Sequence, residues 1–255
     1  MGSVTYRNGI AILQLIVFPF ILVASIFIWR RTGLKVGSRI WRYPFTLSLL
    51  RIAGSICSLL TISNKSQRIY IAEAVCELIG IAPLLLTYIG VLRQIDIDED
   101  IPPRSSRLIT LITFIGLILG IAGVSTADDG NYKNGLTKGA MGIFLAVFVI
   151  YVLMAGWLWI RIYGMKRFQK KLYLAIALSL PFVLVRLVYS AIGDYTEISR
   201  FQLFGDNTVY LCMSVLEEIV AMVITMVLGT SAVLESDFVR LGSAQQSSEP
   251  KNEVV

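Results

Sequence analysis

Seven long apolar runs occupy most of this 255-residue chain, and they constrain its fold more than any other feature. A helix needs roughly 20 apolar residues to cross the hydrocarbon core of a bilayer, and each run has about that length. The runs do not alternate polar with apolar residues, which favours membrane helices over a membrane β-barrel. We therefore predict an all-α, seven-transmembrane helix bundle. The expected spans are about 9–29, 43–63, 69–92, 108–127, 139–160, 172–193 and 209–234.

The composition excludes several other classes of protein. The chain is 56% hydrophobic and 16% charged, whereas soluble domains carry about 25% charged residues. Its net charge of +6 can indicate a nucleic-acid partner, but the basic residues lie in short turns between the apolar runs, so we expect none. The chain has no histidine, and its cysteines (Cys57, Cys76 and Cys212) lie inside apolar runs without CxxC spacing. We therefore expect no metal site and no cofactor.

The distribution of lysine and arginine predicts the orientation of the bundle. The turns after the first, third and fifth spans, together with the C-terminal segment, hold fifteen of these residues, and the opposite side holds six. By the positive-inside rule, the N-terminus is lumenal or extracellular and the C-terminus is cytosolic. Residues 235–255 are rich in Ser, Gln and Glu, and we expect a disordered cytosolic tail there. The expected location is the endoplasmic reticulum membrane.

Six charged side chains fall inside the predicted spans. Each costs at least a few kcal/mol in a bilayer, so each needs a partner or a function. Counting along each span places all six between the middle of the membrane and its lumenal face. Glu73 and Glu77, at spacing i, i+4, share one face of a helix. Glu217 and Glu218 are adjacent and point about 100° apart around the helix. The six residues are Arg51, Glu73, Glu77, Arg186, Glu217 and Glu218.

These charges have two interpretations, which the sequence leaves open. In the first, the arginines pair with glutamates and have the purely structural role of holding the bundle together. Alternatively, the charges can line a polar pocket that opens toward the lumenal leaflet. The glutamates outnumber the arginines, and a carboxyl without an arginine partner in a low-dielectric site can stay protonated near neutrality. Such a group is a general acid.

Several other motifs do not indicate a site. The acidic residues between Asp96 and Asp100 stand in a cytosolic turn before Pro102 and Pro103, unlike the aspartate-rich helix motif that holds a diphosphate through magnesium. We interpret them as a solvated acidic turn. The chain has no phosphate-binding loop and no dinucleotide glycine motif. Without histidine, a Ser-His-Asp triad is excluded.

Four short segments resemble the signature segments of a family of small fungal seven-transmembrane integral membrane proteins. They are residues 6–9 (YRNG), 51–55 (RIAGS), 180–190 (LPFVLVRLVYS) and 211–218 (LCMSVLEE). The resemblance extends over the chain to about Leu234, and it implies the seven-span fold.

A weaker similarity is to membrane-bound terpene cyclases of fungal meroterpenoid pathways, which are also short seven-span proteins without an aspartate-rich motif. It implies acid-initiated cyclisation of an epoxidised prenyl chain in secondary metabolism, an isomerase- or lyase-type reaction. The partners would be a lipophilic substrate, membrane lipid and other pathway enzymes. The expected catalytic set is Glu77 or Glu217 as the acid, Glu73, and Arg186 and Arg51 as orienting residues. The expected substrate-binding residues are Tyr189, Phe182, Tyr210 and Glu218.

Non-enzymatic functions stay open as alternatives. A seven-span receptor-like protein would have the same topology, but Leu92-Arg93-Gln94 stands where a receptor of the G-protein-coupled class has a DRY-like motif. A rhodopsin is excluded because the last span has no lysine for retinal. A small-molecule carrier is the third possibility, since prolines at Pro19, Pro83 and Pro181 can kink three spans beside a cavity.

Overall fold

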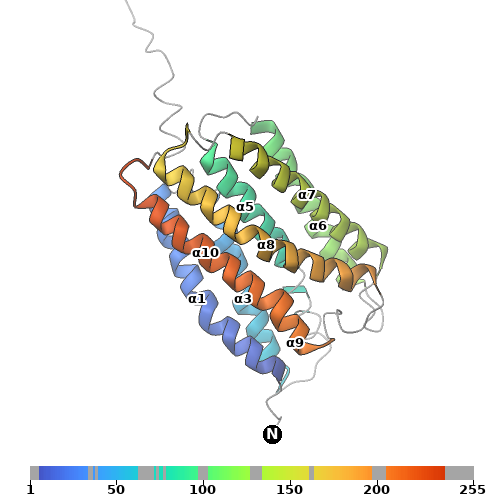
Figure 1. Ribbon diagram of the computed structural model, residues 1–255. Helices are drawn as coiled ribbons and strands as arrows, with labels where there is room; N and C mark the ends of the chain where they lie inside the picture. Colours follow the sequence, from blue (N-terminus) through green and yellow to red (C-terminus); the bar gives the residue numbers. More distant parts are fainter. Residues whose placement is uncertain are drawn as a thin grey trace, which may run out of the picture.

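The computed structural model describes residues 6–33, 37, 40–62, 72, 75–76, 79–96, 103–126, 134–160, 164–196 and 205–238. This part of the chain forms helices and contains no strand, which confirms the all-α prediction for it (Figure 1). The helices are α1 (Tyr6–Thr32), α3 (Arg42–Leu60), α5 (Ile81–Ile95), α6 (Pro103–Ser125), α7 (Gly135–Ile160), α8 (Arg167–Tyr195), α9 (Asn207–Tyr210), the π-helical turn η4 (Leu211–Val215) and α10 (Leu216–Val233).

Six of these helices are long and apolar enough to cross a membrane: α1, α3, α6, α7, α8 and the continuous helix formed by α9, η4 and α10. A seventh, α5, is apolar but has 15 residues. Most of the first half of the expected third span, 69–92, lies outside the described residues. Six long apolar helices in one chain are typical of a multi-pass membrane protein.

Helix α5 forms the centre of the bundle. Every residue of this helix except Arg93 is buried, and the helix packs against α3, α6, α7 and α8 (Figure 1). A helix that is apolar on all sides has no surface suited to water and is stable only when other helices enclose it. Pro83 lies in its first turn, where a missing backbone N–H costs little.

The outer surface of the bundle is apolar. Large hydrophobic side chains are exposed along α1, α6, α7 and α10, and the most exposed include Phe20, Ile118, Leu153 and Val227. In water such a surface would cause aggregation, but it matches the acyl chains of a bilayer.

Glycines allow α6 and α7 to pack closely. A side chain at Gly116 would place its Cβ 3.0 Å from Ile143, and one at Gly123 would place it 2.7 Å from Thr137. Small residues at such contacts let membrane helices approach each other, because dispersion contacts replace the hydrophobic effect there.

Buried polar contacts fix the end of the bundle where α5 ends and α8 begins. Trp41 is fully buried, and its indole Nε1 donates to Gln94 Oε1 at 3.1 Å. Gln169 in the first turn of α8 donates through Nε2 to the Ile95 carbonyl at 2.7 Å. The beginning of the expected tail lies against this end: Glu235 pairs with Lys171, and the Phe238 ring packs edge-on against Phe168.

Candidate functional site

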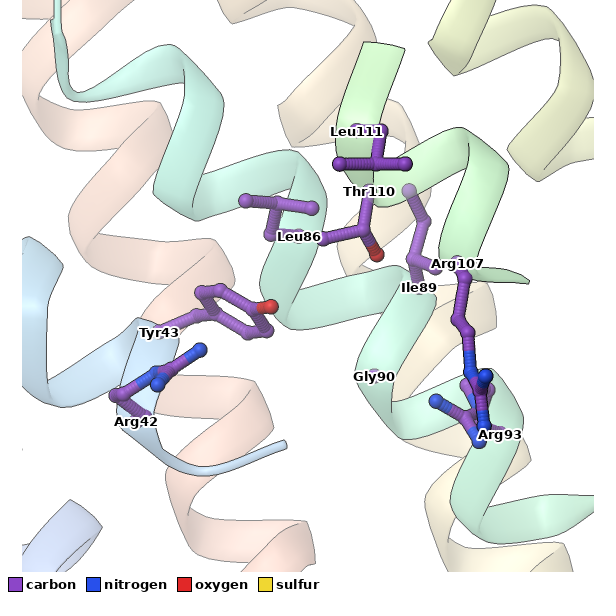
Figure 2. A pocket seen from close by; sticks show the side chains of 9 residues that line it. All are labelled: Arg42, Tyr43, Leu86, Ile89, Gly90, Arg93, Arg107, Thr110 and Leu111. Carbon is purple, nitrogen blue, oxygen red and sulfur yellow. The ribbon is translucent and has the colours of Figure 1, made fainter. Parts of the chain in front are cut away.

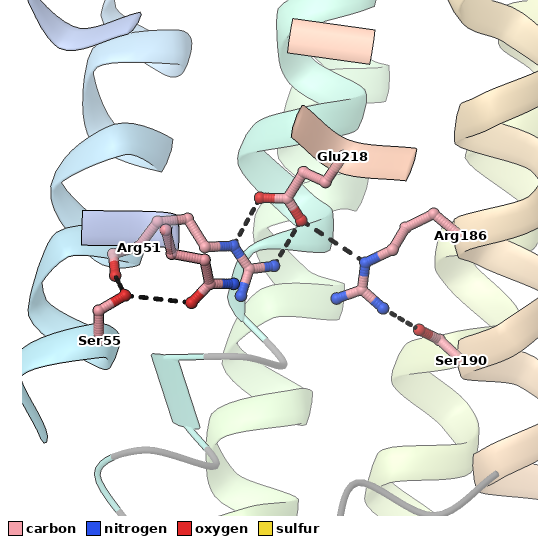
Figure 3. A network of polar contacts seen from close by, with 6 residues as sticks. Arg51, Ser55, Arg186, Ser190 and Glu218 are labelled. Atoms are coloured by element: carbon pink, nitrogen blue, oxygen red, sulfur yellow. Dashed lines mark hydrogen bonds and ion pairs between the residues drawn. The ribbon is translucent and has the colours of Figure 1, made fainter. Parts of the chain in front are cut away.

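The centre of the candidate site is an ion pair between Arg51 and Glu218. Arg51 lies in the middle of α3 and Glu218 in the first turn of α10, and both side chains are 2% exposed. Arg51 Nε donates to Glu218 Oε1 and Nη2 donates to Oε2, each at 2.5 Å (Figure 3). Two parallel, charge-assisted bonds of this kind fix both the distance and the orientation of the carboxylate.

A second arginine reaches the same carboxylate from α8. Arg186 Nε lies 3.5 Å from Glu218 Oε2, and Arg186 Nη1 donates to Ser190 Oγ at 2.8 Å, one turn further along its own helix (Figure 3). Glu218 therefore connects three helices through one side chain. We call Arg51, Glu218 and Arg186 the central ion cluster.

The Ser55 side chain of α3 links the central ion cluster to α1. Ser55 Oγ lies 2.7 Å from the Arg51 carbonyl, one turn back, and 3.1 Å from Oε1 of Gln14, which is buried in α1. On the other side of Arg51 is Gly80, where an added Cβ would lie 2.6 Å from Nη2. The guanidinium therefore occupies the space that a side chain at this position would fill.

The π-helical turn η4 immediately precedes the two glutamates of α10. The Leu216 N–H donates to the Leu211 carbonyl, five residues back instead of four. Such a turn inserts one extra residue and rotates everything that follows, and π-turns inside α-helices are frequent at functional sites. Neither proline nor glycine occurs between Leu211 and Glu218, so no residue in the sequence marks this turn.

The adjacent glutamates lie in different surroundings. Glu218 enters the bundle and is bound by two arginines, whereas Glu217 is half-buried on another side of the helix. Its Oε2 atom is buried and has no hydrogen-bond partner among the residues that the structure describes. The sequence indicated that one of the two would enter the core, and the structure identifies it as Glu218.

The remaining expected site residues are dispersed. Tyr189 and Tyr210 are buried together in a small cluster with Ile10 and Val215, whereas Phe182 packs against the main core. Glu73 and Glu77 lie outside the described residues.

Next to Tyr210 is a small cavity between α1, α3 and α9. It has a volume of about 10 Å³, and Arg7, Gln14 and Ser58 contribute polar atoms to its wall. The Arg7 guanidinium lies over the Tyr210 ring, 5.3 Å from its centroid. A cavity of this size holds about one water molecule.

A second polar group lies further along α10 and was not apparent from the sequence. Thr225 Oγ1 donates to the Tyr88 hydroxyl at 3.2 Å, and Ser179 Oγ donates to the Ala221 carbonyl at 3.2 Å. The Tyr151 ring lies 5.7 Å from that of Tyr88, and its buried hydroxyl has no hydrogen-bond partner within the described part of the chain. Isolated Ser, Thr and Tyr residues in apolar runs are common, so the sequence contains no signal for this group.

The family to which the chain belongs is shown by a match over nearly its whole length. No curated protein and no solved structure matches the chain. A family model described as "Domain of unknown function (DUF7702)" matches residues 4–235, which include all the helices given above. The chain is therefore a member of the DUF7702 family.

Proposed function

We propose that the bundle crosses the membrane of the fungal endoplasmic reticulum seven times, with a lumenal N-terminus and a cytosolic C-terminus. Successive long helices run in opposite directions (Figure 1), and the turns on one side, with the C-terminal segment, hold fifteen lysines and arginines against six on the other side. In sealed microsomes, an external protease should remove a C-terminal epitope tag and leave an N-terminal tag intact. The opposite pattern would overturn the orientation.

We further propose that the protein is a membrane-embedded terpene cyclase that acts on an epoxidised prenyl substrate of the meroterpenoid type. The observation that carries this proposal is the contrast between the two adjacent glutamates. Both carboxylate oxygens of Glu218 are held by arginines. A buried carboxyl oxygen without a partner is better tolerated when the group is neutral, so Glu217 is suited to carry a proton.

The reaction would begin with transfer of that proton to the epoxide oxygen. The carbon–oxygen bond at the more substituted carbon would break while a neighbouring alkene of the prenyl chain attacks that carbon. Loss of a proton from the final cation would give a product isomeric with the substrate. Tyr210 lies seven residues before Glu217, roughly 10 Å along the helix, and with Tyr189 it can offer aromatic faces to the developing cation.

In this proposal the central ion cluster has a positioning role. By holding α3, α8 and α10 together beside the π-turn, it fixes the direction in which Glu217 points. Glu77 is the second candidate for the acid, on the sequence argument alone.

A non-enzymatic function is the alternative that one observation favours. The carboxylate of Glu218 is bound by two arginines of the chain itself, so this cluster can serve structure alone. A receptor-like or small-molecule-binding protein with a rigid core would show the same contacts. Binding without turnover would distinguish this alternative from the cyclase.

The direct test supplies a candidate substrate to microsomes that contain the full chain. A phenol bearing a farnesyl chain with a terminal epoxide is incubated with them, and cyclised isomers are separated by chromatography and identified by mass spectrometry. We expect a cyclised product with the wild-type protein. General acids contribute roughly 100-fold or more to such rates, so Glu217→Gln, or Glu77→Gln if that residue is the acid, should lower turnover by this factor.

The matched control is Glu235→Gln, which removes a carboxylate that pairs with Lys171 at the end of the bundle. It should leave turnover unchanged. If neither Glu217→Gln nor Glu77→Gln changes the product, the assignment of the acid is wrong. If the wild-type protein binds the epoxide saturably and returns it unchanged, the alternative function is supported and the cyclase proposal fails.

A further inference from the structure

A cavity of about 410 Å³ lies between α3, α5 and α6, away from the central ion cluster (Figure 2). It is bordered by the first turn of α3, the part of α5 from Leu86 to Arg93 and the first turns of α6. This is the end of the bundle at which α8 begins (Figure 1). The residues that line it are Arg42, Tyr43, Leu86, Ile89, Gly90, Arg93, Arg107, Thr110 and Leu111.

Three arginines from three helices line the cavity. Arg42 comes from α3, Arg93 from the last turn of α5 and Arg107 from α6, and no acidic side chain is among the described residues that line the cavity. Figure 2 shows Arg93 and Arg107 extending toward each other. A cavity lined by three guanidinium groups offers several hydrogen-bond donors and favours an anionic ligand over a neutral one.

The rest of the cavity wall is apolar. Leu86 lies two turns before Arg93 on α5, roughly 10 Å deeper in the bundle, and Leu111 lies one turn after Arg107 on α6. Leu111 is 61% exposed, and its neighbours Leu108 and Ile115 are similarly exposed on the outer face of α6. The apolar part of the cavity therefore continues into the surface that faces acyl chains.

We infer that this cavity, the arginine pocket, binds the phosphate-bearing headgroup of an anionic membrane lipid, with an acyl chain lying along Leu86 and Leu111. A phosphate accepts hydrogen bonds from several guanidinium groups at once. Basic pockets between membrane helices on the cytosolic side bind such headgroups, and the cytosolic leaflet is rich in anionic lipids. The assignment to that leaflet rests on the proposed orientation, whereas lipid binding itself is independent of it and of the cyclase.

The test measures the affinity of the purified full chain for lipid. The protein is reconstituted in phosphatidylcholine with increasing amounts of phosphatidylinositol phosphate, and the rise in melting temperature gives the affinity. Arg42→Gln/Arg93→Gln/Arg107→Gln should bind the anionic lipid roughly 100-fold more weakly, since each arginine near the headgroup contributes about a factor of five. An unchanged affinity would overturn the proposal.

The matched control removes the same charge at the same end of the bundle, outside the pocket. Arg30, Arg31 and Lys170 are exposed there, and Arg30→Gln/Arg31→Gln/Lys170→Gln should keep the wild-type affinity. An equal loss in this control would mean that diffuse surface charge attracts the lipid, and the proposed pocket would be wrong. A melting curve in phosphatidylcholine alone shows that each variant is folded.

A second variant and a second ligand separate the headgroup from the acyl chain. Leu111→Trp narrows the apolar mouth of the cavity without changing its charge, and the exposed position tolerates a larger side chain. This variant should bind the anionic lipid more weakly. In the wild type, inorganic phosphate should bind far more weakly than the lipid. Equal affinity for phosphate and lipid would show that the pocket takes a free anion, which would overturn the assignment to a lipid.

Discussion

The central ion cluster and the arginine pocket use the same cation in opposite surroundings. In the cluster, Glu218 lies against both arginines, and all three side chains are almost fully buried. In the pocket, three arginines share an open cavity with apolar side chains and a threonine, with no acid among the described residues around it. At the first site an acid of the chain binds the arginines, and at the second we propose that the arginines bind a lipid.

This difference shows that burial and packing, more than residue type, decide what an arginine does in a membrane bundle. A charge enclosed by helices cannot exchange its partner without opening the bundle, so it contributes to structure and positioning. A charge in a cavity that faces lipid can gain or lose a ligand while the helices stay packed. Substitutions at the two sites should therefore have effects of different size.

The largest effect is expected from Glu218→Gln. The substitution keeps the shape of the side chain but removes the negative charge between Arg51 and Arg186. Removing one partner from a buried ion pair typically costs about 3–5 kcal/mol, because the opposite charge stays buried. The free energy of unfolding in detergent should fall by this amount, or the variant should fail to accumulate.

Glu218→Asp is the companion variant, because it keeps the charge and shortens the side chain by one methylene group. It should lose less stability than Glu218→Gln. A Glu218→Gln protein as stable as the wild type would mean that the pairing contributes little, and the positioning role of the cluster would then be abandoned.

A smaller loss is expected from Gly80→Ala. The new methyl group would lie 2.6 Å from Arg51 Nη2, so the guanidinium would have to move away from Glu218. Overpacking of this kind typically costs about 1–3 kcal/mol. Gly156→Ala in α7 is the control, because nothing lies within 4 Å of its added Cβ. There the change should be neutral or stabilising by up to about 1 kcal/mol, and an equal loss at both glycines would contradict the contact with Arg51.

The all-helical class could be predicted from the sequence because apolar length is a local property. Residues 139–160 and 172–193 were expected as spans, and the helices Gly135–Ile160 and Arg167–Tyr195 contain them. The helices extend further because polar first turns remain helical. At the start of α8, the Gln169 side chain accepts a hydrogen bond from the Lys166 N–H.

The pairing of the charges was less accessible, because it depends on helix rotation and on packing between distant segments. Which of Glu217 and Glu218 enters the core follows from the rotation that η4 introduces, and no residue marks that turn. The arginine pocket was not predicted, because its arginines were counted as charges that set topology. Their meeting in one cavity depends on how α3 and α6 pack around α5.

A partly exposed ion pair is a third case to compare with the central ion cluster and the arginine pocket. Lys171 and Glu235 form an ion pair near the start of α8, but their side chains are 35% and 23% exposed. Exposed pairs contribute about 0.2–1 kcal/mol, because water and salt screen the attraction. Lys171→Met should therefore lower the free energy of unfolding by no more than this amount. A loss as large as that of Glu218→Gln would mean that burial does not separate the two pairs.

The smallest effect in the absence of anionic lipid is expected from Arg107→Gln. Arg107 is exposed at the rim of the arginine pocket and extends toward Arg93 (Figure 2). Without anionic lipid, the exposed side chain contributes little to stability, so the free energy of unfolding in phosphatidylcholine should change by no more than about 0.5 kcal/mol. With phosphatidylinositol phosphate present, the same variant should be less stable than the wild type, because it loses a contact with the ligand. A variant that is destabilised equally with and without this lipid would show that Arg107 serves the fold, and the contrast with the central ion cluster would no longer hold.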